Sequence, residues 1–173
     1  MKNVVAALVT LTLTVPTAFA HATLEKGEAP QQSTYKAVIR VGHGCDGEPT
    51  RALRVQIPEG VISVKPMPKA GWTVEKVKGP YEKTYDYYGT PLTEGVKELV
   101  WKGELSDDEY DEFVFRAYLT DALPVGSTVW FPIVQECANG AERWIEIPSE
   151  GQSPDDLEGP APGVKVSEPV AGH

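Results

Sequence analysis

Short apolar runs alternate with polar residues along most of the chain and predict β-strands. Leu53, Val55 and Ile57 alternate with polar residues, so all three share one face of a strand. Runs of this kind, rich in β-branched and aromatic residues, lie at residues 35–41, 53–57, 61–64, 72–77, 96–101, 112–119, 129–134 and 144–147. Turn signals such as Pro58-Glu-Gly60 and Asn139-Gly140 separate them. This spacing predicts an all-β fold, a two-sheet β-sandwich, with a closed barrel as the alternative.

The composition changes from about Ser149 onward. Residues 149–173 are rich in proline, glycine and acidic side chains, and their apolar content is too low to offset the entropy of ordering. They are predicted to form a mostly disordered C-terminal tail. The folded domain is therefore expected to span residues 21–148.

Residues 1–20 have the pattern of a cleaved signal peptide. A positive charge precedes an uncharged, mostly apolar stretch that is shorter than the roughly 20 residues of a membrane-spanning helix. Small residues at Ala18 and Ala20 suit a signal peptidase. Cleavage after Ala20 leaves a periplasmic or secreted protein that begins at His21 and has no membrane span. The alternative is an uncleaved N-terminal anchor.

The two cysteines of the chain, Cys45 and Cys137, are interpreted in the light of this export. Disulfides persist in oxidising compartments, and an even number of cysteines predicts one disulfide between them. The alternative is a pair of thiolate metal ligands, but the two residues lack the C-x-x-C spacing that is common in such sites.

Charge and motifs exclude several classes of function. The formal net charge is −9 at pH 7, and loss of Lys2 with the signal peptide makes the mature chain more acidic still. Such a surface repels nucleic acid and anionic lipid headgroups. The sequence has no G-x-S-x-G elbow, no H-E-x-x-H and no phosphate-binding glycine loop. The sequence thus carries no hydrolase signature, and we expect that the protein is not an enzyme.

A mature N-terminal histidine offers two nitrogens to one metal ion. The α-amine and the imidazole Nδ1 of His21 close a six-membered chelate. Their reference pKa values, roughly 7.7–8.0 and 6.5, allow both nitrogens to bind near neutral pH. Two nitrogens in a tetragonal plane suit Cu(II). The alternative is that His21 is simply the residue that cleavage leaves first.

The other histidines limit how such a site is completed. His43 lies in a loop beside Cys45, and His173 ends the predicted tail. The two-histidine brace of oxidative polysaccharide enzymes therefore lacks its second core histidine, and other residue types must complete the site. The candidate carboxylates are Glu25, Glu28, Asp111 and Glu112.

Four parts of the sequence together resemble the YcnI-like copper-binding domain family. They are His21-Ala-Thr-Leu, the segment 65–72 (KPMPKAGW), the segment 111–115 (DEFVF) and Trp144. The resemblance covers about residues 21–148. It implies a β-sandwich of cupredoxin or immunoglobulin type, encoded near copper-import or copper-handling genes.

The resemblance also implies a one-histidine brace for Cu(II). His21 would supply the amine and Nδ1, Glu112 a carboxylate, and Trp144 an indole that lies close to the metal and shields it. From the residues alone, Glu112 is a solvent-facing strand residue and Trp144 a core or edge aromatic. Glu25, four residues from His21, competes with Glu112 as the carboxylate ligand.

Three functions from different classes are compatible with the sequence. The first is an exported protein that binds one Cu(II) for copper trafficking or homeostasis, with a periplasmic copper chaperone or a copper transporter as its partner. The second is an oxidative copper enzyme with a site like a histidine brace. The third is a metal-free module that binds an envelope glycan or protein. Met67 is the only methionine of the mature chain, which argues against a Met-rich Cu(I) relay.

Overall fold

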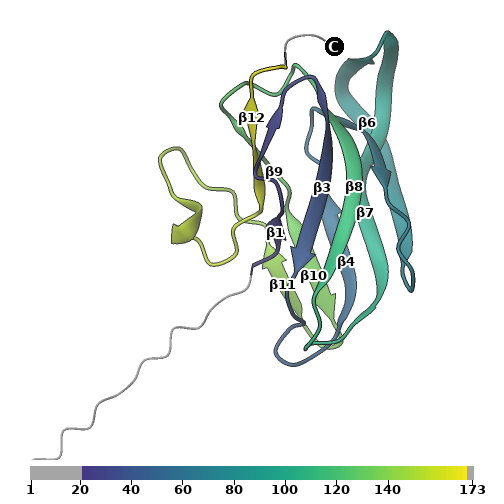
Figure 1. The fold of residues 1–173 in the computed structure, drawn as a ribbon, viewed down its shortest axis with the longest axis vertical. Helices are drawn as coiled ribbons and strands as arrows, with labels where there is room; N and C mark the ends of the chain where they lie inside the picture. The colour runs from purple at the N-terminus through teal and green to yellow at the C-terminus, as the bar shows by residue number, and fades with distance from the viewer. Residues whose placement is uncertain (1–20, 171–173) are drawn as a thin grey trace, which may run out of the picture.

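The computed structural model of the protein describes residues 21–170, and nearly all regular structure in that part is β-strand (Figure 1). The predicted signal peptide, residues 1–20, and residues 171–173 with His173 lie outside the described residues. The one helical element of the described part is a single 3-10 turn, η1 at Pro154–Asp156. Within residues 21–170, no helix is long and apolar enough to cross a membrane.

Two larger sheets and one small sheet make up the fold (Figure 1). The four-stranded sheet has the order β1 (Thr23–Leu24), β3 (Ser33–Val41), β8 (Asp111–Leu119), β5 (Val61–Pro66). The five-stranded sheet has the order β11 (Ala141–Trp144), β10 (Ile133–Cys137), β4 (Thr50–Gln56), β7 (Thr90–Leu105), β6 (Thr73–Tyr87). The small sheet has the order β2 (Glu28–Pro30), β12 (Gly163–Ser167), β9 (Thr128–Trp130).

The main core contains residues of both larger sheets, and their burial confirms the predicted strand phases. Leu53 and Val55 on β4 are fully buried, as are Phe113 and Phe115 on β8. The ring centroids of Phe113 and Trp101 lie 5.7 Å apart, which joins β8 of one sheet to β7 of the other. Full burial of one such side chain contributes about 1.5–3 kcal/mol, so these residues are among those that stabilise the packing of the two sheets.

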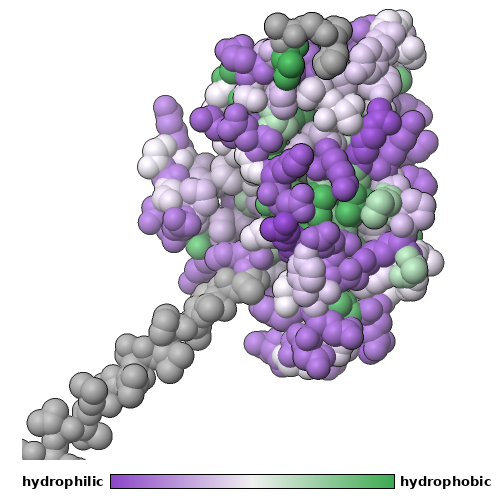
Figure 2. Space-filling model, viewed as in Figure 1, coloured by the Kyte–Doolittle hydropathy of each residue, from purple (hydrophilic) through white to green (hydrophobic). Residues whose placement is uncertain are grey.

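Hydrophilic residues dominate the face shown in Figure 2, around a small hydrophobic area over the middle of β3 and β8. Val38 and Val114 are register partners on β3 and β8. They are 4% and 9% exposed.

Three strand boundaries differ from the prediction. The run at 129–134 is divided between β9 and β10, because Pro132 has no N–H to donate to a ladder. β11 ends at Trp144, whereas the prediction began a strand there. β6 and β7 extend through residues 78–95 as a long hairpin, although glycine, proline and charged residues hid the strand pattern there.

The prediction that residues 149–173 form a disordered tail is wrong for the described part. β12 pairs in parallel with β2 and antiparallel with β9. Val164 and Val166 are fully buried in the main core, while Lys165 between them is exposed. The average composition of this segment is typical of disorder, yet two valines at alternate positions are buried in the core. Strands that are distant in the sequence supply its backbone hydrogen-bond partners.

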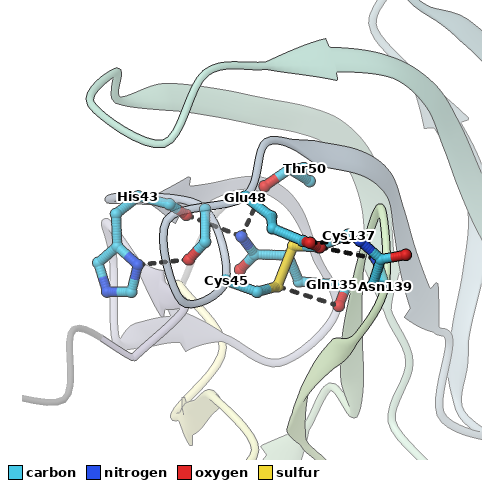
Figure 3. The surroundings of a disulfide bond; sticks show 8 residues. His43, Cys45, Glu48, Thr50, Gln135, Cys137 and Asn139 are labelled. Atoms are coloured by element: carbon cyan, nitrogen blue, oxygen red, sulfur yellow. Dashed lines mark hydrogen bonds between the residues drawn. A yellow bond between two sulfur atoms is a disulfide. The ribbon is translucent and has the colours of Figure 1, made fainter.

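The predicted disulfide between Cys45 and Cys137 is present (Figure 3). The two Cα atoms lie 6.0 Å apart, and the bond joins the β3–β4 loop to the end of β10. Beside it, the buried Gln135 amide donates to the carbonyl oxygen of His43 at 2.7 Å and to Thr50 Oγ1 at 2.6 Å. The loop that carries His43 is therefore held against β10 by a covalent bond and by hydrogen bonds.

Substitutions in β12 test the correction to the predicted tail. Val164→Ala and Val166→Ala should each lower the free energy of unfolding by about 1–3 kcal/mol, because each removes buried methyl groups and leaves a cavity. Lys165→Ala, between them, should change it by less than about 0.5 kcal/mol. Denaturant unfolding followed by tryptophan fluorescence measures all three. Equally small effects for the three variants would support the original prediction that this segment is disordered.

Candidate functional site

His21 is half-buried and lies two residues before Thr23, the first residue of β1, which is the edge strand of the four-stranded sheet. Thr23 of β1 pairs with Arg40 of β3. Ala22 is 3% exposed and belongs to the main core, so it fixes the backbone beside His21 to the sandwich. In the uncleaved chain the nitrogen of His21 belongs to a peptide bond, and only cleavage would turn it into an amine ligand.

A row of register partners leads from β1 to Glu112. Thr23 lies opposite Arg40, and Arg40 lies opposite Glu112 on β8. Directly opposite residues point to the same face of a sheet, so the three side chains share the outer face. Arg40 Nη2 is 3.0 Å from Glu25 Oε2, and Arg40 Nε is 3.6 Å from Glu112 Oε1. Two of the candidate carboxylates therefore share one guanidinium.

Hydrogen bonds and ion pairs connect Arg40, its two carboxylate partners and Tyr110. The hydrogen bond with Glu25 raises the pKa of the Arg40 guanidinium. The Tyr110 hydroxyl donates a hydrogen bond to Glu112 Oε1, and this bond raises the pKa of the Tyr110 phenol. About two-fifths of each charged side chain is exposed, at 43% for Arg40, 40% for Glu25 and 38% for Glu112. The Glu112 carboxylate is accessible to a cation, but the positive charge of Arg40 beside it opposes cation binding.

Asp111, a further candidate carboxylate, is paired with a lysine. Its Oδ1 lies 2.5 Å from Lys69 Nζ, which also donates to the backbone oxygen of Glu112 at 3.0 Å. Segments 65–72 and 111–115, two of the parts that carry the sequence resemblance, are therefore in contact. Lys69 thus connects the segment 65–72 to the start of β8.

Trp144 and Glu28 lie in other sheets than Glu112. Trp144 ends β11, pairs with Ile133 of β10 and is 5% exposed within the main core. Glu28 is exposed on β2 of the small sheet. The residues of the implied site thus come from the start of β1, from β8 and from β11, which belong to both larger sheets.

No three His, Cys, Asp or Glu side chains among residues 21–170 are grouped so as to hold a metal ion. The implied copper site contains only two side chains of these types, His21 and Glu112. Its remaining nitrogen would be the freed α-amine of His21. A binding site of this composition depends on cleavage after Ala20.

A pocket of about 390 Å³ opens beside His21. The tryptophan that lines this pocket is Trp130 on β9, not Trp144. Part of its wall is the segment predicted to be disordered, through Pro154, Pro160 and Pro162. Sequence reasoning missed both features. The available signal was the alternation of buried Val129 and Phe131, which leaves Trp130 between them on the other face.

A family model described as "Domain of unknown function (DUF1775)" matches residues 21–166. The match begins at His21 and reaches into β12, so it includes the segment that composition assigned to a tail. None of the curated proteins matches the chain.

A solved structure has the same architecture. It is the crystal structure of an uncharacterized protein from Nocardia farcinica, described as revealing an immunoglobulin-like fold. Its TM-score is 0.59 at 22% sequence identity, and the match covers 85% of this chain and 98% of that chain. At this identity the likeness shows the fold alone, and it confirms the predicted all-β sandwich. Since the family model covers nearly all of the described residues, the protein belongs to the DUF1775 family.

Proposed function

We propose that the protein is exported and that, once cleaved after Ala20, it holds one Cu(II) ion through His21 for copper trafficking or homeostasis. The observation that carries this proposal is the position of His21. The family match begins at this residue, and the next residue, Ala22, is buried in the core. A freed terminus here would present its amine and imidazole from a fixed point on the sandwich.

On this proposal the chain is a YcnI-like member of the DUF1775 family that works in the periplasm or outside the cell. The Cys45–Cys137 disulfide is compatible with an oxidising compartment. Copper is cargo rather than a catalytic centre, and a periplasmic copper chaperone or a copper transporter receives or supplies it. No enzymatic step is proposed.

Glu112 is the carboxylate proposed to complete the site. It shares Arg40 with Glu25, whose Oε2 lies closer to the guanidinium. If Glu112 turned toward a cation, Arg40 would keep Glu25 as its partner, so that no charge would be left unpaired. Glu25 is the competing ligand, and its departure would break the shorter of the two ion pairs.

The first test of the proposal is the chain terminus. Protein that begins at His21 should bind one Cu(II) per chain. The same protein with one alanine ahead of His21 should bind roughly 100-fold more weakly or worse, since loss of the amine removes a ligand and each 1.4 kcal/mol is a factor of ten. Copper titration followed by EPR gives both the stoichiometry and the ligand field. Equal affinity for the two proteins would contradict the proposal.

A second prediction separates the two carboxylates. Glu112→Gln should weaken Cu(II) binding about tenfold or more, because it removes an anionic oxygen ligand. Glu25→Gln should have a smaller effect, and Glu104→Gln, which removes an exposed carboxylate paired with Arg51, should have none. Competition titrations at one pH compare the four proteins. A larger loss for Glu25→Gln than for Glu112→Gln would exchange the two assignments.

A third prediction concerns the indole. Bound Cu(II) should quench the fluorescence of Trp144, so Trp144→Phe should reduce the quenching and change the EPR spectrum of the copper-loaded protein. Trp130→Phe is the matched variant, because Trp130 lines the pocket beside His21. Thermal unfolding of both variants controls for damage to the core. If Trp130→Phe alone changes quenching and spectrum, the role assigned to Trp144 is wrong.

A further inference from the structure

Three tyrosines form a cluster at the β6–β7 turn, far along β8 from Glu112. The ring centroids of Tyr87 and Tyr88 lie 4.9 Å apart, and those of Tyr87 and Tyr118 lie 5.3 Å apart. The Tyr88 and Tyr118 centroids are separated by 5.4 Å, and Arg116 Nη2 donates to the Tyr87 hydroxyl at 3.1 Å. The cluster is held from two strands, yet Tyr88 remains 73% exposed.

A groove of about 720 Å³ lies beside this cluster. We define the tyrosine groove by six of the residues that line it: Tyr88, Tyr118, Gln32, Ser33, Thr34 and Asp86. Tyr118 and Thr34 are register partners on β8 and β3, so the groove lies at the outer face of the four-stranded sheet. Its volume falls within the roughly 300–1,000 Å³ of small-molecule sites.

The charges around the groove restrict what it can bind. Among the described residues that line it, Asp86 is the only charged one, and its Oδ2 already accepts a hydrogen bond from the Gly89 N–H at 3.1 Å. Without a lysine or arginine in its lining, the groove does not suit phosphate or other anionic ligands. The chain's net charge of −9 acts in the same direction.

Besides the apolar Pro30, Pro169 and Val170, the groove is lined by aromatic and uncharged polar side chains that match the two surfaces of a sugar ring. A pyranose has an apolar C–H face, which packs on an aromatic ring, and a rim of hydroxyls that both donate and accept hydrogen bonds. Tyr88 and Tyr118 offer the rings, while Gln32, Ser33 and Thr34 offer amide and hydroxyl groups. A neutral oligosaccharide uses both kinds of group at once.

Two residues that line the groove have backbone conformations that non-glycine residues rarely adopt. Tyr88 and Gly89 form a two-residue loop with φ values of 51° and 81°, a type I′ turn that favours asparagine or aspartate at its first position. The chain itself uses the favoured residue in its other such loop, where Asp46 and Gly47 have φ values of 50° and 84°. Gln32, also in the groove, has a φ of 54°. Strained non-glycine residues of this kind gather at binding sites.

We propose that the tyrosine groove binds a neutral oligosaccharide. The Tyr88 ring stacks on one sugar ring, and Gln32 and Asp86 take hydroxyls of the same or the next sugar. The proposal rests on the groove alone and is independent of copper binding at His21.

Tyr88→Asn is the decisive variant, because it removes the ring and supplies a residue that the turn prefers. Isothermal titration of the mature protein with cellohexaose, chitohexaose and maltohexaose should show binding of at least one at millimolar affinity or better. Tyr88→Asn should weaken that binding by about tenfold or more. Its melting temperature should stay within a few degrees of the parent, because relief of backbone strain offsets the lost ring contacts.

Two further variants complete the test. Gln32→Gly places glycine at the groove's other left-handed position and removes the side-chain amide. It should therefore weaken binding without loss of stability. Asp46→Asn makes a comparable change in the turn outside the groove and should leave binding unchanged. Absence of binding to all three hexasaccharides, or parental affinity in Tyr88→Asn, would overturn the proposal. So would binding of nonaproline in place of the sugars, which would identify the groove as a peptide site.

Discussion

Burial of Phe113 and Phe115 between the two larger sheets sets the phase of β8, and much of the rest of the surface depends on that phase. Both side chains are fully buried, and their rings contact Trp101 on β7 of the other sheet and, in connecting segments, Trp72 and Phe131. Because side chains alternate along a strand, the intervening positions must face outward. A slip of one residue would turn every outward side chain of β8 into the core, which the buried phenylalanines prohibit.

The same alternation places the two proposed binding regions on one strand. Glu112 and Tyr118 are both outward positions of β8, six residues apart, which corresponds to about 20 Å along the strand. This separation keeps the two proposed contact residues well apart along the strand. Arg40 and Glu112 balance charge near one end, while the groove at the other has Asp86 as its one charged lining residue among those described. A protein built in this way could hold a cation and a neutral ligand without interference between them.

The sequence predicted best what depends on local alternation and least what depends on distant partners. Leu53, Val55 and the phenylalanines of β8 were recognised because their burial follows a period of two. β12 was missed because Val164 and Val166 are only two apolar positions among prolines and glycines, and their partner strands β9 and β2 lie far away in the sequence. For the candidate site, the pattern before His21 and the cysteine pair could be interpreted directly. The roles of Arg40 and Trp130 could not, because they arise from pairing between strands and from the fold of the C-terminal segment.

On the proposed function, Arg40 determines how much Glu112 contributes to copper binding. A cation near Glu112 is repelled by the guanidinium, so the carboxylate alone would hold it weakly. The two nitrogens of a freed His21 must therefore supply most of the binding, and Glu112 adds to it only by exchanging one positive partner for another. When copper leaves, Glu112 returns to Arg40 and Tyr110, the contacts it makes in this structure. A carboxylate that regains its partners in this way lowers the cost of release, as suits a protein that passes its metal on.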